Sequence, residues 1–166
     1  RLSICTMVDY KGQISPITKQ IKDNIKMISK NLNKDGLRVI AVCQKNDIDI
    51  NNPFSVSDEK NMILFGFIGF LDPPKETAKS SIEKLNKAGI RVVVLTGDNA
   101  EVTKCICSKV GINTKRIVTG SQIEKLSDIA ALRLLKKTNI FVKLSPIQKA
   151  RIVRLLKEDG NVVGYM

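Results

Sequence analysis

The sequence predicts an α/β protein, a parallel sheet with helices on both faces that follows a smaller α+β portion. The run at 91–95, Arg-Val-Val-Val-Leu, has four consecutive apolar residues, three of them β-branched, which is typical of a strand buried on both faces. Beyond it, helical and strand patterns alternate, which predicts crossover helices between parallel strands. The Pro73-Pro74 step cannot continue a strand ladder. We therefore predict two portions, residues 1–71 and 72–166, each incomplete at one end of the chain.

The first 36 residues are expected to contain one helix. Residues 1–8 are typical of the tail of another element, and residues 9–15 of a turn-rich link. Ser15-Pro16 is a typical helix start, because serine caps a first turn and proline is tolerated in it. Gly36 is a typical stop. The apolar residues recur at the spacing of one helical face: Ile17, Ile21, Ile25, Ile28 and Leu32.

The rest of the first portion predicts two strands and a loop between them. Residues 37–43 are apolar and β-branched, and residues 61–71 form a longer apolar run. Gly66 and Gly69 inside that run predict bends in the strand. Residues 45–60 are polar, so we expect a surface loop there.

The second portion is expected to alternate between helices that end at glycines and short strands. Helices are predicted from residue 78 to Gly89, from residue 100 to Gly111, and from residue 146 to Gly160. Residues 123–138 are expected to add one or two more. Their inward positions are Ala78, Ile82, Leu85, Val102, Ile106, Val110, Ile147, Ile152, Val153 and Leu156. Strands are predicted at 91–95, 116–119, 140–144 and 162–166.

The charge balance is strongly basic. Lys plus Arg number 28 against 16 Asp plus Glu, which gives a net charge of +12 and favours polyanionic partners. Aromatic residues are only 4% of the chain, the lysines are scattered, and no motif that reads nucleic acid is present. We therefore expect no nucleic-acid partner. A basic module for nucleic acid or anionic lipid remains an alternative that rests on charge alone.

The cysteines do not predict a metal site. The four residues have no Cys-x-x-Cys spacing, and the sequence contains no histidine, so the usual zinc ligand sets are unavailable. We expect no metal ligands, and reduced thiols typical of a cytosolic protein. No apolar run approaches the length of a membrane span. The cysteines are Cys5, Cys43, Cys105 and Cys107.

The strand at 91–95 ends abruptly in Thr96-Gly97-Asp98-Asn99. Polar groups at the carboxyl end of a buried strand lie where open α/β sheets bind their ligands. Gly97 lets the backbone turn tightly and approach a ligand closely. The Thr96 hydroxyl and the Asp98 carboxylate suit a phosphoryl group with its lysine or metal partners. The alternative is a turn followed by a helix N-cap.

Three segments, in one order and at characteristic separations, resemble the cytoplasmic headpiece of P-type cation ATPases. They are Leu71-Asp72-Pro73-Pro74-Lys75, Thr96-Gly97-Asp98-Asn99 and Lys143-Leu144-Ser145-Pro146-Ile147-Gln148-Lys149-Ala150-Arg151-Ile152-Val153. The similarity extends upstream to residues 36–42, covers nearly the whole chain, and is closest to bacterial magnesium-transporting ATPases at residues 70–77. In that family, a nucleotide-binding domain is inserted into a phosphorylation domain of the haloacid-dehalogenase type. The resemblance thus implies that 1–71 is the second half of the nucleotide-binding domain and that 72–166 is part of the phosphorylation domain.

The resemblance also implies roles for individual residues. Thr96 would bind an oxygen of the transferred phosphoryl group, Asp98 would order the loop and help to place the nucleotide phosphates, and Lys149 would neutralise the aspartyl phosphate. Arg38 would reach the ATP phosphates, and Asp72 would help the hinge to close on nucleotide. A lysine at a helix N-terminus adds its charge to unpaired backbone N–H groups, which suits an anion. The alternatives are a solvated lysine, an outward strand residue at Arg38 and a helix cap at Asp72.

Departures from the family pattern limit what this chain can do alone. The family nucleophile lies in an Asp-Lys-Thr-Gly-Thr segment and its metal-binding Asp in a Gly-Asp-Gly-x-Asn-Asp segment, and the sequence contains neither. The Lys-Gly-Ala segment of the nucleotide pocket would precede Arg1. We therefore expect the chain alone to bind nucleotide weakly at best and to form no phosphoenzyme.

The whole pump would use ATP and Mg²⁺ at the cytoplasmic face of the membrane. Its other parts, the transmembrane helices, the actuator domain and the rest of the phosphorylation domain, would be the partners of this chain. Ion selectivity would lie in the membrane helices, so magnesium as cargo rests on subfamily resemblance alone. A soluble phosphatase of the haloacid-dehalogenase superfamily is the alternative enzyme. It requires an Asp-x-Asp segment after its first strand, and the sequence shows none there.

Overall fold

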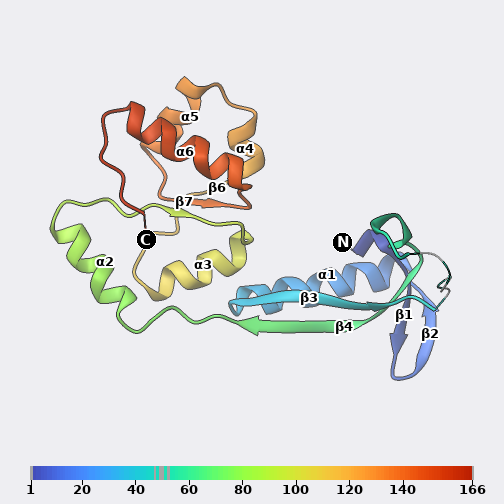
Figure 1. The fold of residues 1–166 in the computed structure, drawn as a ribbon. Coiled ribbons are helices and arrows are strands. Elements are labelled where there is room, and N and C mark those ends of the chain that lie inside the picture. The colour runs from blue at the N-terminus through green and yellow to red at the C-terminus, as the bar shows by residue number, and fades with distance from the viewer. Residues whose placement is uncertain (1, 47, 49–50, 52, 166) are drawn as a thin grey trace. The chain divides into compact units, whose positions relative to one another are not determined.

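The chain divides into two units, Arg1–Leu71 and Asp72–Met166. A computed structural model describes residues 2–46, 48, 51 and 53–165 (Figure 1). Each unit has its own sheet and its own core. The α/β class predicted from the sequence is confirmed, with a mixed sheet in the first unit and a parallel sheet in the second.

The first unit is a four-stranded sheet in the order β2-β1-β4-β3 with one long helix, α1 (Lys19–Lys34). Strand β4 pairs in parallel with β1 and antiparallel with β3. Ile25 of α1 packs against Leu64 of β4, which is only 2% exposed. The strands are β1 (Cys5–Tyr10), β2 (Gln13–Pro16), β3 (Leu37–Gln44) and β4 (Met62–Leu71), and two 3-10 helices span Leu2–Ile4 and Val56–Asp58.

Residues 9–16 form a hairpin, so the predicted link and helix start there are wrong. Lys11 (φ 54°) and Gly12 (φ 84°) both adopt the left-handed conformation that two-residue hairpin turns require. The Asp9 carboxylate accepts a hydrogen bond from the Gly12 amide at 2.8 Å. Pro16 ends β2, an edge strand, where a missing N–H is tolerated. The helix begins instead after Thr18, whose hydroxyl accepts a hydrogen bond from the Ile21 amide.

The longer elements of the first unit follow the sequence patterns. Gly36 (φ 88°) follows the C-cap of α1, as expected, although Ile28 is 51% exposed rather than inward. The described part of 45–60 is a loop with one short 3-10 turn. Strand β4 bends near Gly66, where its register with β3 shifts, but its pairing runs unbroken through Gly69.

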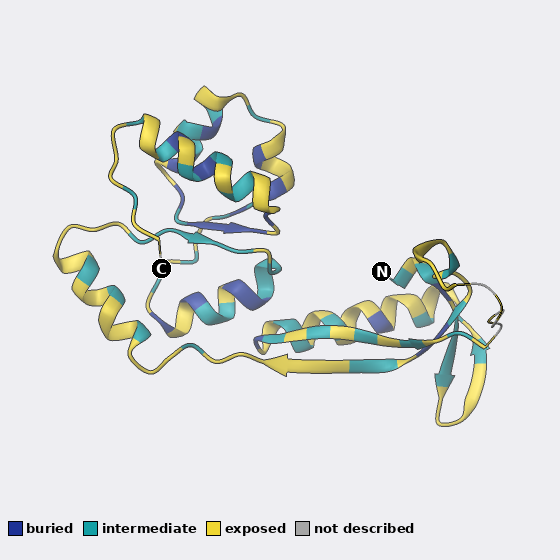
Figure 2. Cartoon of the chain, in the orientation of Figure 1, coloured by how far each residue is buried: buried dark blue, intermediate teal, exposed yellow. Residues whose placement is uncertain are grey.

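The second unit is a three-stranded parallel sheet, β5-β7-β6, between helices. Figure 2 shows β7 as the deeply buried centre of this unit. Phe141 packs with residues of α4, α5 and α6, whereas Ile140 and Val142 pack with Cys107 of α3. The elements are α2 (Ala78–Lys87), β5 (Val94–Leu95), α3 (Ala100–Lys109), β6 (Ile117–Thr119), α4 (Gly120–Glu124), α5 (Asp128–Leu135), β7 (Ile140–Val142) and α6 (Pro146–Glu158).

The strand buried on both faces is therefore β7 and not the run at 91–95. Only Val94 and Leu95 of that run pair with a neighbour, and both are half-buried, because β5 lies at the edge of the three-stranded sheet. Arg91 instead donates hydrogen bonds to the carbonyl oxygens of Leu135 and Thr138 and to the side chain of Asn139. The β-branched run marks a strand correctly, but its length and burial depend on the neighbouring strands.

Two further predictions of the second unit are wrong. Ile147 is 82% exposed, because it lies in the first turn of α6 on the side away from the core. Residues 162–165 of the strand predicted at 162–166 are not a strand, and Val162 and Tyr165 are exposed. Met166 lies outside the described residues. An apolar run becomes a strand only where a neighbouring backbone satisfies its N–H and C=O groups. Ile152, by contrast, is fully buried as predicted.

Candidate functional site

The carboxyl ends of β5 and β7 lie side by side and are joined by backbone hydrogen bonds. The Thr96 amide donates to the Phe141 carbonyl oxygen at 3.0 Å. Beyond the strands, the Leu144 amide donates to the Thr96 carbonyl oxygen at 3.0 Å, and the Lys143 amide donates to the Asp98 carbonyl oxygen at 2.8 Å. The loop after β5 is thus fixed to the segment that leads into α6.

The Thr96 loop is closed by its own side chains. The Thr96 hydroxyl donates to Oδ2 of Asp98 at 3.0 Å and accepts a hydrogen bond from the Asp98 amide at 3.1 Å. Asn99 then caps α3, with its Oδ1 accepting from the Val102 amide at 3.0 Å. The turn and helix N-cap considered as an alternative are therefore present. The same turn holds a hydroxyl and a carboxylate at the carboxyl end of a parallel strand, where ligands bind in open α/β sheets.

Gly97 is exposed, and its backbone does not adopt the left-handed conformation. A Cβ built at this position would lie 3.6 Å from the Leu144 carbonyl oxygen, an ordinary contact distance. The turn itself therefore does not require glycine, contrary to one of the two reasons inferred from the sequence. Close approach of a ligand to Gly97 stays a prediction.

Lys149 lies in the first turns of α6, on the element that follows the Lys143 segment. Ser145 and Gln148 form a capping box: the Ser145 amide donates to Gln148 Oε1 at 2.9 Å, and the Gln148 amide donates to the Ser145 hydroxyl at 3.3 Å. The Lys149 side chain is half-buried and lines a shallow hollow that also includes Val153. It makes no hydrogen bond or ion pair with any residue that the structure describes.

The structure thus brings some of the predicted site residues together and leaves others apart. Thr96, Gly97 and Asp98 form one loop, and the backbone bonds place the start of the Lys149 helix beside it. No hydrogen bond joins the side chains of Thr96 and Lys149.

Arg38 and Asp72 lie away from the Thr96 loop in the sequence. Arg38 is exposed on β3, directly opposite Phe70 of β4, on the sheet face that also exposes Ile40. Asp72 is exposed in an irregular segment. Helix α2 begins at Ala78 with Thr77 as its N-cap, so a helix cap at Asp72 is excluded.

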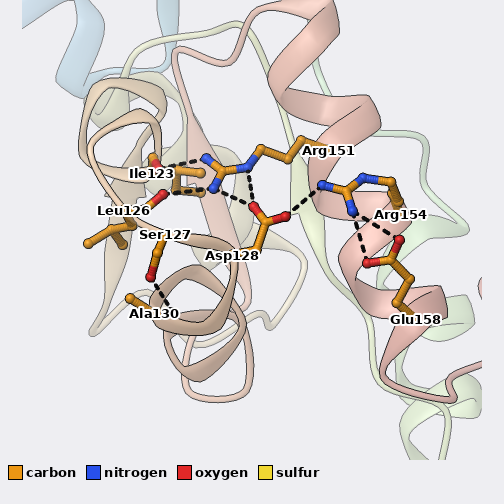
Figure 3. A network of polar contacts seen from close by, with 8 residues as sticks. All are labelled: Ile123, Leu126, Ser127, Asp128, Ala130, Arg151, Arg154 and Glu158. Atoms are coloured by element: carbon orange, nitrogen blue, oxygen red, sulfur yellow. Dashed lines mark hydrogen bonds and ion pairs between the residues drawn. The ribbon is translucent and has the colours of Figure 1, made fainter.

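An ion-pair network fixes α6 to the start of α5 (Figure 3). Arg151 donates to the carbonyl oxygens of Ile123 and Leu126 at 3.0 and 2.7 Å, and its Nη2 lies 2.6 Å from Oδ1 of Asp128. Arg154 bridges Asp128 and Glu158 at 2.9 Å. Hydrogen bonds from Arg154 and then Arg151 hold the pKa of Asp128 below its ordinary value.

A second clamp joins the starts of α6 and α4. Gln148 Nε2 donates to the Gly120 carbonyl oxygen at 3.3 Å. A Cβ at Gly120 would lie only 2.6 Å from the Lys143 carbonyl oxygen, so no larger residue fits. Neither clamp is among the contacts predicted from the sequence. The capping-box pattern of Ser or Thr followed three residues later by Gln, at Thr119 and Ser145, is a readable signal for the two helix starts, whereas the contacts of Arg151 have none.

The described residues contain no group of three or more His, Cys, Asp or Glu that could hold a metal ion. Among the helices of the same described residues, none combines the length and the hydropathy needed to cross a membrane. All four cysteines are free, as expected.

Comparisons with known proteins match both units. Residues 2–77 match the cytoplasmic domain N of P-type ATPases, and residues 44–164 match the haloacid dehalogenase-like hydrolases. The chain is 41% identical over 165 residues to magnesium-transporting ATPase, P-type 1, of Escherichia coli K12, a match that covers 99% of this chain and 18% of that protein. It is 30% identical to calcium-transporting ATPase 1 of Bacillus cereus, over 96% of this chain and 18% of that protein.

A eukaryotic relative shows the same pattern. The endoplasmic reticulum calcium ATPase srcA of Aspergillus fumigatus is 34% identical over 92% of this chain and 17% of that protein. The chain therefore spans about a fifth of the length of the curated relatives it matches. The resemblance to P-type ATPases inferred from three sequence segments is confirmed by these matches.

Proposed function

Since the chain belongs to the haloacid dehalogenase-like hydrolase family, we propose that it is part of the catalytic headpiece of an ATP-driven cation pump. The observation that carries this proposal is the backbone-bonded pair of segments at the carboxyl edge of the parallel sheet. One segment holds Thr96 and Asp98, and the other opens the helix of Lys149. Similarity to P-type ATPases over nearly the whole chain favours the pump over a soluble phosphatase.

We assign the two units to two domains of such a pump. The match of residues 2–77 to the cytoplasmic domain N supports the first unit as part of a nucleotide-binding domain. The match of residues 44–164 to the haloacid dehalogenase-like hydrolases, together with the parallel sheet, supports the second unit as part of a phosphorylation domain. The irregular segment that contains Pro73 and Pro74 would be one of the chain segments that form the hinge between the two domains.

In this proposal, Thr96 and Lys149 bind the phosphoryl group. Phosphoryl transfer depends on positioning and on cancelling the charge that develops on the phosphoryl oxygens. The Thr96 hydroxyl, now directed to Asp98, can donate instead to a phosphoryl oxygen. The Lys149 ammonium has no anionic partner among the described residues, so it can pair with the phosphate without breaking another ion pair. Gly97 would leave room for the ligand beside the loop.

Arg38 and Asp72 would act on nucleotide. A guanidinium at an exposed strand position can bind phosphate oxygens in a bidentate geometry, which supports contact between Arg38 and the ATP phosphates. Asp72 precedes the two prolines, where an exposed carboxylate can contribute to closure of the hinge. Asp98 would order the Thr96 loop while the nucleotide phosphates bind.

ATP and Mg²⁺ would be the cofactors of the whole pump. The exposed cation of Arg38 and the donors of Thr96 and Lys149 suit the phosphates of ATP. Mg²⁺ requires several oxygen ligands, and the described residues offer no cluster of acidic groups, so we assign no metal ligand to this chain. The transmembrane helices, the actuator domain and the rest of the phosphorylation domain would be its partners, at the cytoplasmic face of a membrane. Magnesium as the cargo rests on the names of its relatives.

Labelling with ATP tests the proposal. A full-length protein that contains this chain should take up γ-phosphate from ATP as an acid-stable, hydroxylamine-labile adduct, as an aspartyl phosphate does. The 166-residue chain alone should take up none, because it has no Asp-Lys-Thr-Gly-Thr segment. Failure of the full-length protein to label, or labelling of the chain alone, would contradict the proposal. ATP-dependent uptake of Mg²⁺ into membrane vesicles would then test the cargo.

A further inference from the structure

A basic hollow of about 440 Å³ lies at the other end of the second unit's sheet. It is formed by the segment between α3 and β6 and by the segment between α5 and β7. Because β6 and β7 are parallel neighbours, both segments lie at the amino ends of their strands, opposite the end that carries Thr96. The hollow is lined by Asn113, Lys115, Arg116, Lys136, Lys137, Thr138 and Asn139.

The charge of this hollow is positive and only partly compensated. Lys136 is paired with Asp159 at 2.8 Å. Lys115, Arg116 and Lys137 form no ion pair with any residue described in the structure. No carboxylate lines the hollow. Like charges held close together repel one another, so three such cations around one concave surface favour an anion between them.

Thr138 provides a second, independent observation. Thr138 lines the hollow and is only 2% exposed, and its buried hydroxyl has no hydrogen-bond partner in the described part of the chain. A buried hydroxyl without a partner is costly, and native proteins rarely keep one. The Thr138 carbonyl oxygen, unlike the hydroxyl, has a partner, because it accepts a hydrogen bond from Arg91 at 2.7 Å. After rotation of the Thr138 side chain, this hydroxyl could donate a hydrogen bond to an oxygen of a ligand bound in the hollow.

The remaining polar groups are arranged as donors. Oδ1 of Asn113 already accepts from the Lys115 amide at 2.9 Å, and Oδ1 of Asn139 accepts from Nε of Arg91 at 2.8 Å. Each asparagine therefore has its NH₂ group left to donate. Ammonium, guanidinium, amide and hydroxyl donors around one hollow match the several acceptor oxygens of a phosphate group.

We propose that this hollow binds a phosphate-type anion, either a free phosphate or the phosphate of a lipid headgroup. The site does not depend on the pump assignment, because it uses none of the residues placed in phosphoryl transfer. It would place an anion at the end of the sheet opposite the Thr96 loop.

Titration of the chain with inorganic phosphate tests the proposal. Amide NMR signals of residues 113–116 and 136–139 should shift in a saturable way, and calorimetry should give a Kd. The double variant Arg116→Gln/Lys137→Gln should raise that Kd about tenfold or more, because charge-assisted hydrogen bonds are lost. The matched control Lys104→Gln/Lys109→Gln, on exposed positions of α3, removes the same charge and should leave the Kd within about twofold. Equal weakening by the control would overturn a specific site.

Thr138→Val separates ligand binding from folding. It removes the buried hydroxyl and keeps the shape of the side chain, so the Tm should stay equal or rise, whereas the Kd for phosphate should increase. An unchanged Kd would overturn the role of Thr138 and the proposed site with it.

Vesicles of phosphatidylcholine with and without phosphatidate test the source of the phosphate. If the chain sediments with phosphatidate vesicles and Arg116→Gln/Lys137→Gln abolishes the sedimentation, the ligand is a lipid headgroup. If the chain binds inorganic phosphate but does not sediment with the vesicles, the ligand is a soluble anion. Binding of neither overturns the proposal.

Discussion

The carbonyl oxygen of Asp98 accepts a hydrogen bond from the amide of Lys143 at 2.8 Å, which joins the loop after β5 to the loop after β7. A second bond, from the Leu144 amide to the Thr96 carbonyl oxygen at 3.0 Å, fixes the same two loops. Both use backbone groups, so the arrangement does not depend on flexible side chains. Backbone hydrogen bonds between the loops after β5 and β7 therefore fix the position of Thr96 relative to the start of α6.

Gly120→Ala should destabilise the second unit by about 1–3 kcal/mol, because the added methyl group would meet the Lys143 carbonyl oxygen at 2.6 Å and push α4 away from α6. Urea unfolding followed by circular dichroism measures the effect. Gly164→Ala is the matched control, since a Cβ there meets nothing within 4 Å. Equal stability of both variants would show that a Cβ at position 120 does not collide with the Lys143 carbonyl oxygen.

Gly97→Ala should leave stability unchanged or raise it by up to about 1 kcal/mol, because alanine fits the backbone and restricts the unfolded chain. In a full-length protein, the same change should lower the rate of phosphoenzyme formation if a phosphoryl group approaches the loop closely. Thermal unfolding and ATP labelling give the two readouts. A parental rate of labelling would contradict the prediction that a phosphoryl group approaches Gly97 closely.

Asp128→Asn should weaken the attachment of α6 and lower the urea midpoint at pH 7. The pKa of Asp128 is lowered from 3.8 in the folded state, so its contribution is present above pH 3.8 and is lost as the pH falls through the lower, folded-state pKa. The free energy of unfolding should therefore fall less steeply with decreasing pH in the variant than in the parent chain. Unfolding curves from pH 7 to pH 2 measure it. Identical slopes in both chains would contradict the ion pair with Arg151.

Cys5 should react slowly with thiol reagents at neutral pH. Burial first, and then its hydrogen bond with Cys43 at 3.3 Å, raise the pKa of Cys5 from 9.0 to about 11. A raised pKa means that the folded state holds the proton more tightly. The contribution of Cys5 to stability is therefore complete below pH 9 and is lost as the pH rises towards 11. Mass spectrometry after brief alkylation should find Cys105 modified before Cys5, and Cys5→Ser should reduce the alkaline loss of stability. Rapid alkylation of Cys5 at pH 7 would refute the assignment.

Local patterns predicted most elements of the fold. The sequence predicts that a strand ends at Thr96-Gly97-Asp98-Asn99, with a turn and helix N-cap as the alternative to a ligand loop, and it predicts helix ends at glycines such as Gly36 and Gly160. Both signals depend on neighbouring backbone groups. The hairpin at 9–16 is not among the predicted elements, although its Lys11-Gly12 turn is visible in the sequence. Ser15-Pro16 carried a helix-start signal that the edge strand overrode.

Tertiary relationships could not be predicted in the same way. The β-branched run at 91–95 and the shorter run of β7 are similar as sequences, and only the order β5-β7-β6 makes β7 the buried centre. Arg151 is a polar residue on a helix, and nothing in its neighbours shows that it binds the carbonyl oxygens of Ile123 and Leu126. Such contacts depend on which helices meet, which local patterns do not encode.

The role of Lys149 in phosphoryl transfer is the central claim, and phosphoenzyme formation in a full-length protein tests it most directly. Lys149→Ala and Lys157→Ala remove the same charge from the same helix, and only the first lies in the turns beside the Thr96 loop. We predict that Lys149→Ala lowers the initial rate of labelling from ATP about 100-fold, as loss of one charge-stabilising group does, while Lys157→Ala keeps the parental rate. Equal labelling rates in the two variants would contradict the account.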